Sequence, residues 1–277
     1  MLRQPTESLP QRVLVTLMAD YKDTIQHSVP ASVLTAVLLD FDITPEAART
    51  ALSRLGKKGI LERTKSGRSA AYSLSDDALK MVDEDMTRIF TFGEQNSWDG
   101  HWTLVAFSIA ERDRAKRYVL RTQLRALGFA PLYDGVWGCA HATVDQAQAA
   151  LADAGVDDAL VIRGDIAGDV SSIMSQFKQS WQLDEVATKY QDFILSVTPL
   201  VERARSGRVA PAEALVARTR VMDAWRVFPR IDPDLPELLL PAEWPRAQAR
   251  TCFMEAWTLL RDAAELRLKV LVEDTGR

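Results

Sequence analysis

Residues 44–74 read TPEAARTALSRLGKKGILERTKSGRSAAYSL, and this stretch decides how the N-terminal third of the chain folds. At about 100° per residue, Ala48, Ala51, Leu52 and Leu55 lie on one side of a helix, as packing against a core requires. The opposite side carries polar and basic residues: Arg49, Thr50, Ser53, Arg54 and Lys57. The spacing therefore predicts an amphipathic helix with a basic outer face.

The ends of this helix are marked in the sequence. Thr44 can accept a hydrogen bond from a free amide of the first turn, Pro45 suits the first helical position, and Glu46 complements the positive helix end. Gly59 follows the last periodic residue, where a helix commonly stops. These signals predict a helix over residues 44–58.

A hairpin is predicted directly after the helix. Residues 60–65 alternate between the two faces of a strand, and the same two-residue period resumes over residues 70–74. Ser-Gly at 66–67 supplies the turn, so Lys65 and Arg68 lie at its tip.

Two further helices, over residues 11–21 and 31–41, precede this unit, and three helices followed by a hairpin are typical of a winged helix-turn-helix. Residues 44–72 carry seven basic and two acidic side chains, a local net charge of +5 in a chain of net charge −4. Such placement favours phosphate binding, because Coulombic attraction supplies the sequence-independent part of DNA affinity. A basic surface that is only solvated, or that contacts protein, is the alternative.

We expect two groups of DNA-binding residues. The first faces base edges in the major groove: Arg49, Thr50, Ser53 and Arg54. The second contacts phosphates or the adjacent minor groove: Lys57, Arg63, Lys65 and Arg68.

The remaining sequence predicts an α+β multidomain protein. An acidic helix after Ser75 leads to residues 98–163, whose order of strand, helix, strand, strand, helix, strand indicates a ferredoxin-like domain with adjacent, antiparallel first and third strands. From residue 171 the pattern is helical, with helices over 172–177, 183–205, 211–228 and 247–272. We therefore expect a DNA-binding domain with its connector (1–92), a ferredoxin-like domain (93–170) and a helical domain (171–277).

Composition restricts the function. The 277 residues are 47% apolar and 26% charged, with no run of about 18 apolar residues and no apolar signal core, which favours a cytoplasmic protein. Cys139 and Cys252 stand 113 positions apart without zinc-ligand spacing. Gly-rich phosphate loops, Gly-x-Ser-x-Gly and His-Glu-x-x-His are absent, so we expect neither an enzyme nor a cofactor.

Several sequence blocks in the middle and C-terminal regions resemble one family. They are WDGHW at 98–102, VAFSI at 105–109, GF at 128–129, GVW at 135–137, FPRIDPDLP at 228–236 and WP at 244–245. On these blocks the chain is similar to the PaaX family, transcriptional repressors of aromatic-acid catabolism named for phenylacetic acid degradation. It departs from the pattern at Ile231 and at Arg246, where glycine is expected.

The resemblance implies a winged helix, a Cas2-like middle domain of ferredoxin topology and a helical C-terminal domain. It also implies a homodimer that binds double-stranded operator DNA and releases it on meeting an aryl-acyl-CoA such as phenylacetyl-CoA. A constitutive DNA-binding or assembly protein remains an alternative. A Cas2-like metal-dependent nuclease is another, although Ser108-Ile109-Ala110 stands where an acidic metal ligand would end the first strand.

Two clusters are candidates for effector binding. One is a stripe of guanidinium groups that could bind coenzyme A phosphates: Arg114, Arg117, Arg121 and Arg125. The C-terminal helices are interrupted by a Pro-rich crossover over residues 229–245. The other candidate combines aromatic planes with cations at this crossover: Trp225, Arg226, Phe228 and Arg230. A solvated helix face and core packing are the respective alternatives.

The sequence also offers one candidate metal site. His101 precedes the first strand of the middle domain, and Cys139 and His141 end and follow the third. Antiparallel pairing of these strands should bring the three side chains together, and two imidazoles with a thiolate could bind a transition metal. Histidines that are exposed or bonded within a core are the alternative.

Overall fold

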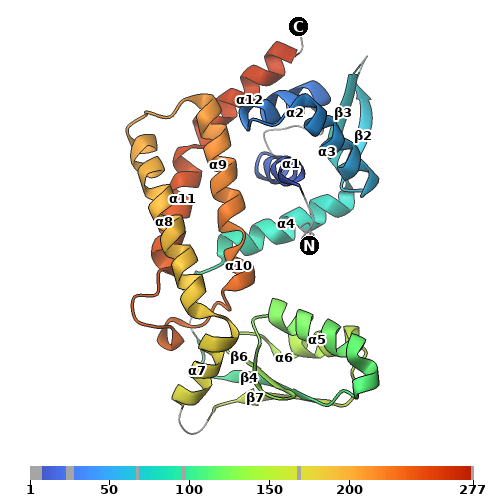
Figure 1. Cartoon of the computed structure of the whole chain (residues 1–277), viewed down its shortest axis with the longest axis vertical. Coiled ribbons are helices and arrows are strands. Elements are labelled where there is room, and N and C mark those ends of the chain that lie inside the picture. The colour runs from blue at the N-terminus through green and yellow to red at the C-terminus, as the bar shows by residue number, and fades with distance from the viewer. Residues whose placement is uncertain (1–7, 23–27, 67–68, 95–97, 167–169, 276–277) are drawn as a thin grey trace. The chain divides into compact units, whose positions relative to one another are not determined.

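The computed structural model describes residues 8–22, 28–66, 69–94, 98–166 and 170–275 (Figure 1). The chain forms two compact units, each assembled from segments that are distant in sequence. Unit 1 comprises Met1–Thr91, Phe193–Arg226 and Gln248–Arg277, and unit 2 comprises Phe92–Asp192 and Val227–Ala247.

The N-terminal part of unit 1 contains helices and a small sheet. In chain order these are α1 (Leu9–Asp20), β1 (Val29–Pro30), α2 (Ala31–Asp40), α3 (Pro45–Lys57), β2 (Leu61–Ser66), β3 (Ser69–Leu74) and α4 (Asp76–Thr91). The helix predicted over residues 44–58 is α3, and the Thr44 hydroxyl accepts a hydrogen bond from the amide of Ala47 at 3.3 Å. Its apolar stripe is buried as the sequence predicted.

The predicted hairpin is β2–β3, which pairs in antiparallel register from Leu61 opposite Leu74 to Ser66 opposite Ser69. A third strand, β1, pairs with β3 and gives the sheet order β1-β3-β2. Sequence reasoning missed β1 because two residues, Val29 and Pro30, are too few to show a strand period.

The middle of unit 2 is a four-stranded sheet with helices. Its elements are β4 (Trp102–Phe107), α5 (Arg114–Ala126), β5 (Ala130–Tyr133), β6 (Val136–Cys139), α6 (Val144–Asp153) and β7 (Ala159–Gly164), with a short 3-10 helix η1 (Glu111–Asp113) before α5. The strand order β5-β6-β4-β7 is that of the ferredoxin-like fold. β4 and β6 are adjacent and antiparallel, with Thr103 opposite Cys139, so the predicted pairing is confirmed.

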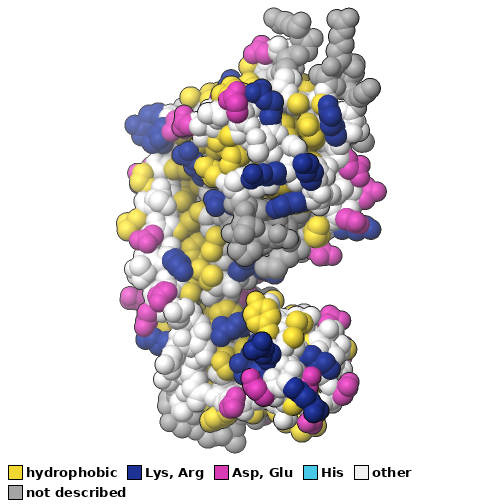
Figure 2. Space-filling view, turned by 45° about the vertical axis from the view of Figure 1, so that its right-hand side comes forward, with side chains coloured by type: hydrophobic (Ala, Val, Ile, Leu, Met, Phe, Trp, Pro, Cys, Tyr) yellow, Lys and Arg dark blue, Asp and Glu magenta, His cyan; other side chains and the backbone are white. Residues whose placement is uncertain are grey.

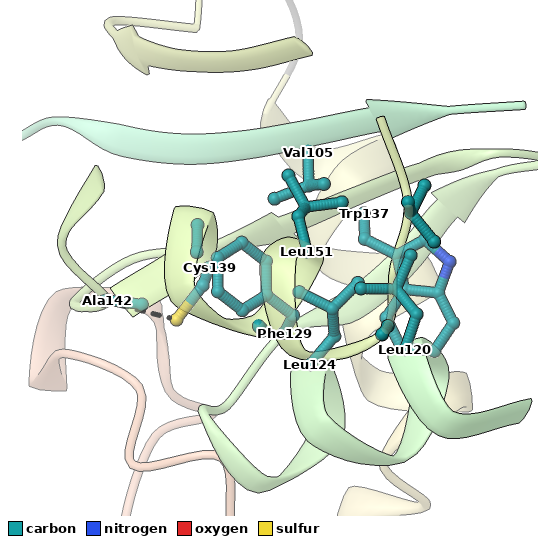
Figure 3. Packing of buried hydrophobic residues seen from close by; sticks show 12 residues of the cluster. Val105, Leu120, Leu124, Phe129, Trp137, Cys139, Ala142 and Leu151 are labelled. Atoms are coloured by element: carbon teal, nitrogen blue, oxygen red, sulfur yellow. Dashed lines mark hydrogen bonds between the residues drawn. The ribbon is translucent and has the colours of Figure 1, made fainter. Parts of the chain in front are cut away.

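Apolar residues cover both faces of this sheet. On one face Val105 and Trp137 pack with Leu120 and Leu124 of α5 and with Leu151 of α6 (Figure 3). On the other face a second cluster forms from Trp102, Ala130, Leu132, Phe177 and Trp181. Because successive strand residues point to opposite faces, Trp102 and Val105 of one strand serve different cores.

The C-terminal region is helical. Its elements are α7 (Val170–Ser180), α8 (Leu183–Arg205), α9 (Pro211–Trp225), α10 (Phe228–Ile231), η2 (Glu237–Leu239), α11 (Arg246–Leu259) and α12 (Arg261–Thr275). The helix predicted over residues 247–272 is in fact divided at Leu260, which is 1% exposed. No proline or glycine marks this break, so the apolar period runs across it. Within the described part of the chain, every helix is too short or too polar to cross a membrane.

A buried ion pair joins N-terminal and C-terminal helices inside unit 1. Arg218 of α9 lies 3.0 Å from Asp20 at the end of α1, and both side chains are almost fully buried. The guanidinium lies between the rings of Tyr21 and Trp257, with its carbon 4.8 and 4.4 Å from their centroids. Trp257 Nε1 donates to Asp20 Oδ1 at 2.8 Å, and Asp20 Oδ2 faces the Arg218 guanidinium.

Candidate nucleic-acid interface

The outer face of α3 carries residues that were predicted from the sequence to bind DNA. Ala48 and Leu55 are fully buried, which fixes the rotation of the helix about its axis. All five polar residues of the opposite side are exposed: Arg49, Thr50, Ser53, Arg54 and Lys57. Figure 2 brings this side of the chain forward and shows several Lys and Arg side chains close together.

Arg49 already holds an anion. Its Nη2 lies 2.8 Å from Glu46 Oε1, one helical turn earlier, and both side chains are more than half exposed. The pKa of the Glu46 carboxyl is lowered, first by its own backbone amide and then by Thr44 and Arg49. An exposed pair of this kind contributes less than about 1 kcal/mol, so a phosphate or a base edge can replace the carboxylate.

The hairpin contributes Arg63, which is exposed on β2 opposite Tyr72. Lys65 belongs to the same strand, opposite Ala70, and its side chain is not among those described. Arg68, at the tip, lies outside the described residues. Of the three basic residues expected to contact DNA from the hairpin, Arg63 is therefore the one whose exposed side chain the structure describes, and Lys65 is placed by its backbone pairing.

The arginine stripe lies along α5 in unit 2: Arg114, Arg117, Arg121 and Arg125. Three of its members have partners within unit 2. Arg117 bonds Glu111 at 2.9 Å and the carbonyl of Ile109 at 2.6 Å. The Arg125 guanidinium lies 5.6 Å from the ring centroid of Trp137. Arg121 lies 3.9 Å from Asp134, so the stripe is a mixed surface and not a row of four free guanidiniums.

The second effector candidate is divided between the two units. Trp225 is fully buried in unit 1, stacks on Phe253 at 5.0 Å and donates from Nε1 to the carbonyl of Ile89 at 3.1 Å. Arg226 donates to the Thr16 hydroxyl at 3.0 Å in the same interior. These two residues hold helices together.

Phe228 and Arg230 belong to unit 2. The Phe228 ring stacks on Tyr190 with centroids 4.0 Å apart, and Arg230 is partly buried. Two residues of this candidate thus belong to unit 1 and two to unit 2.

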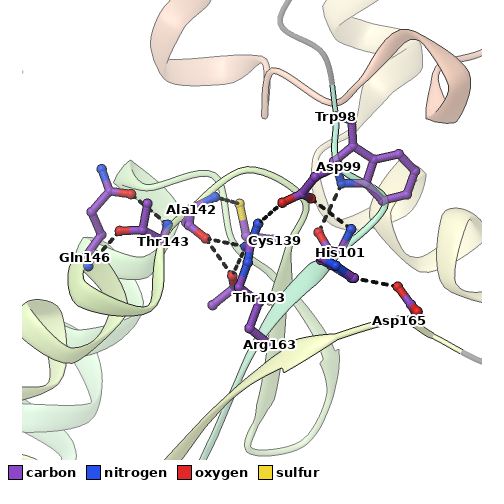
Figure 4. A network of polar contacts seen from close by, with 10 residues as sticks. All are labelled: Trp98, Asp99, His101, Thr103, Cys139, Ala142, Thr143, Gln146, Arg163 and Asp165. Atoms are coloured by element: carbon purple, nitrogen blue, oxygen red, sulfur yellow. Dashed lines mark hydrogen bonds and ion pairs between the residues drawn. The ribbon is translucent and has the colours of Figure 1, made fainter.

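His101, Cys139 and His141 do not form one cluster, and Figure 4 shows His101 beside Asp165 and apart from Cys139. His101 Nδ1 lies 2.7 Å from Asp165 Oδ1, whereas the Cys139 thiol is buried, 3.8 Å from His141 Nδ1. Among the described residues, no three metal-binding side chains come together. The prediction of a three-residue site is wrong because strand pairing fixes backbones and not side chains: Cys139 contacts His141, but His101 pairs with Asp165.

Polar bonds fix the same end of the sheet (Figure 4). Arg163 of β7 donates to the Thr103 hydroxyl at 2.9 Å and pairs with Asp99 at 2.5 Å. Thr103 in turn donates to the carbonyl of Ala142 at 2.5 Å. This network joins β4, β7 and the residues after β6, which supports a structural role.

Sequence reasoning missed a hydrogen-bonded cluster of two carboxylates and an arginine in the crossover of unit 2. Asp232 is buried and accepts hydrogen bonds from Tyr190 at 2.8 Å and Trp244 at 3.3 Å. Arg246 lies 3.3 Å from Asp232 and 3.0 Å from Asp234. The departure from glycine at position 246 therefore supplies a cation to the buried Asp232 and the partly buried Asp234.

Three protein-family models match the chain along its length. They are described as PaaX-like protein (residues 10–78), PaaX protein central Cas2-like domain (residues 95–170) and PaaX-like protein C-terminal domain (residues 181–269). The chain belongs to the PaaX family of repressors. The middle domain of this PaaX-family chain is accordingly Cas2-like.

A curated relative supports this membership. The transcriptional repressor PaaX of Escherichia coli (strain K12) is 28% identical over 253 residues, which cover 88% of this chain and 79% of the relative. That relative is a transcriptional repressor, which fits the expectation that this chain is not an enzyme. A solved structure, an uncharacterized protein from Mycobacterium tuberculosis, is 20% identical with a TM-score of 0.58. It covers 94% of this chain and 99% of its own, and this likeness concerns the fold alone.

Proposed function

We propose that this protein represses transcription by binding operator DNA through its N-terminal elements. The observation that carries the proposal is the exposed basic and hydroxyl face of α3, whose opposite face is buried. In this proposal α1, α2 and α3 with the sheet β1-β3-β2 form a winged helix-turn-helix. α3 is then the recognition helix, and the β2–β3 hairpin is the wing.

In this proposal the chemistry of each side chain decides whether it contacts bases or phosphates. Arg49 and Arg54 can each donate two hydrogen bonds to the O6 and N7 atoms of guanine, and Thr50 and Ser53 are short enough for close approach to bases. Lys57 and Arg63 have the charge for phosphate contacts, which set affinity without reading sequence. Lys65 and Arg68 belong to the same proposal for the wing.

Ligand response is the finer part of the proposal. From the family resemblance we infer a cytoplasmic homodimer that leaves its operator when an aryl-acyl-CoA or related aromatic effector binds. Arg114 and Arg121 are the best placed members of the α5 stripe for coenzyme A phosphates. Arg117 is hydrogen-bonded and Arg125 lies against Trp137, whereas the contact of Arg121 with Asp134 is long, at 3.9 Å. Release requires that the ligand bind a DNA-free conformation more tightly than the DNA-bound one.

The DNA proposal is tested by selecting operator sequences from a random duplex library and measuring affinity by fluorescence anisotropy. Arg54→Ala should weaken the selected operator by about 1 to 3 kcal/mol and relax base choice at one position. Lys57→Gln should weaken selected and random duplexes alike and reduce the salt dependence by about one counterion.

The matched control is Lys80→Gln, a lysine that is exposed on α4 outside the proposed interface. It should bind every duplex as the unmodified protein does. Equal effects of Lys57→Gln and Lys80→Gln would show that general charge, and not α3, drives binding. Failure of Arg54→Ala to change either affinity or base choice would contradict the placement of α3 in the groove.

A further inference from the structure

An apolar cavity of about 310 Å³ lies in unit 1 between α2 and α12, which run beside each other (Figure 1). Its floor is formed by Leu17 of α1 with Val33 and Val37 of α2, each 1% exposed. Leu268 and Val272 of α12 form the opposite wall. The volume lies at the lower end of the range of small-molecule sites.

An ion pair at one end sets the spacing of the two helices. Arg267 of α12 donates from Nε and Nη2 to the two carboxylate oxygens of Asp40, both at 2.8 Å. Asp40 is the last residue of α2, three positions after Val37, so this bidentate pair lies beside the cavity. Such a pair has fixed geometry. It therefore resists the approach of α2 to α12 that would close the space.

The rim carries opposite charges. Lys269 and Glu273 both line the cavity and both are exposed. Among the residues that the structure describes, Lys269 has no hydrogen bond or ion pair with another side chain. A ligand with an apolar body would replace the water over the aliphatic walls, and a single carboxylate could pair with Lys269. Glu273, one turn further along α12, disfavours a second carboxylate.

We propose that this cavity binds a small monocarboxylic acid with an aromatic or branched aliphatic body. A coenzyme A thioester is too large for the space, so the occupant is the free acid. The site is distinct from the α5 stripe, which lies in the other unit.

The inference deepens the proposed function and rests on it, because the acid would act as an effector of DNA binding. α2 packs against α3, the proposed recognition helix, as well as against α12. A ligand wedged between α2 and α12 can therefore favour one position of α2 and, through it, one position of α3. Reciprocity then requires that operator DNA change the affinity for the acid by the same factor.

Isothermal titration calorimetry of the full-length protein tests the site, with benzoate, 3-phenylpropionate and isovalerate as probes. At least one of them should bind at millimolar concentration or below, and succinate should not. Val272 is half exposed, so Val272→Trp can fill the cavity from the rim without disturbing the core. It should weaken binding at least about tenfold, the effect of losing the apolar contact of a small body.

The matched control is Val270→Trp, because Val270 is exposed on the same helix and does not line the cavity. It should leave binding unchanged. Lys269→Gln should weaken 3-phenylpropionate about threefold and leave 3-phenylpropanol unaffected, since only the acid pairs with the lysine.

Binding that survives Val272→Trp, or no binding of any probe acid, would overturn the site. The selected operator is titrated with the same preparation. Intact operator binding without acid binding removes the cavity proposal and leaves the repressor proposal standing. An acid that binds the cavity but leaves operator affinity unchanged would overturn its role as effector.

Discussion

Single residues in the crossover of unit 2 make its stability depend on pH. Asp234 has a φ of 54°, and its amide donates to Asp232 at 2.8 Å. Burial raises the pKa of the Asp234 carboxyl to about 6; Arg246 opposes this rise and Asp232 adds to it. Below the usual carboxyl pKa, Asp234 is protonated in both the folded and unfolded states. As pH rises from about 4 to about 6, the unfolded state ionises while the partly buried Asp234 still holds its proton in the folded state. Stability therefore falls over this range and stays lower above it.

Asp234→Asn removes this titration while keeping a residue that tolerates positive φ. Relative to the variant, the unmodified protein should lose on the order of 1 to 3 kcal/mol of folding free energy between pH 4 and pH 7. Urea unfolding followed by tryptophan fluorescence at several pH values measures the difference. Asp157→Asn, at an exposed position, is the control. A stability difference that grows in the opposite direction would refute the assignment.

The buried pair of Arg218 and Asp20 gives a second test at this scale. Arg218→Met should cost about 3 to 5 kcal/mol, because it leaves the Asp20 carboxylate in the interior without its cation. Asp20→Asn added to Arg218→Met should restore part of that loss. Arg205→Met is the comparison, since Arg205 pairs with Glu255 at 2.6 Å on the surface and should cost less than about 1 kcal/mol. Equal losses in chemical denaturation would show that burial does not matter.

Among the elements, the turn between β5 and β6 depends on one glycine. Gly135 has a φ of 79°, and its carbonyl accepts a hydrogen bond from the amide of Phe107 at 2.8 Å. A Cβ at this position would lie 2.7 Å from the Phe107 carbonyl oxygen, which is backbone and cannot move freely. The turn and the end of β4 therefore require the absence of a side chain.

Gly135→Ala should lower the melting temperature of the full-length protein by several degrees more than Gly100→Ala. Gly100 also has positive φ, 85°, but an added Cβ would meet nothing within 4 Å. Both variants carry the backbone strain of about 1 kcal/mol, and only the first adds the steric clash. Differential scanning calorimetry measures the two shifts. Equal shifts would mean that the turn relaxes around the methyl group.

The bounds of a helix or strand can be predicted from sequence when the residues that set them lie next to it in the chain. α3 could be bounded from sequence because Thr44 and Pro45 start it by local hydrogen bonding and fixed φ. The division between α11 and α12 could not, because Leu260 is apolar, helix-favouring and buried by tertiary contacts. β1 could not be predicted either, because it is defined by its pairing with β3, where the partner of Val29 is Tyr72, more than forty positions away.

On the scale of the molecule, residues 1–91 share unit 1 with two C-terminal segments. Trp225 donates to the carbonyl of Ile89, and Arg250 donates to that of Phe90 at 2.9 Å. The Phe90 ring packs on Phe253, with centroids 5.7 Å apart. These contacts all involve the end of α4, so the N-terminal elements bury part of their apolar surface only against the C-terminal helices.

A fragment of residues 1–92, taken from the sequence as a domain of its own, should therefore unfold at a lower temperature than unit 1 in the full-length protein. Circular dichroism at 222 nm follows the transition. Adding the fragment of residues 193–277 in trans should raise the melting temperature, because binding to the folded state stabilises it. A fragment as stable as the intact chain would show that the contacts around Phe90 contribute little.

The sequence by itself determined the amphipathic α3, the hairpin, the ferredoxin-like order of unit 2 and the family, because helix and strand periods and turn residues are local properties. Only the tertiary structure decided which side chains meet. Arg246 pairs with Asp232 and Asp234, and His101 pairs with Asp165 instead of Cys139. Val37 and Val272 line the same cavity. Such meetings depend on rotamers and on packing between distant segments, which residue spacing does not encode.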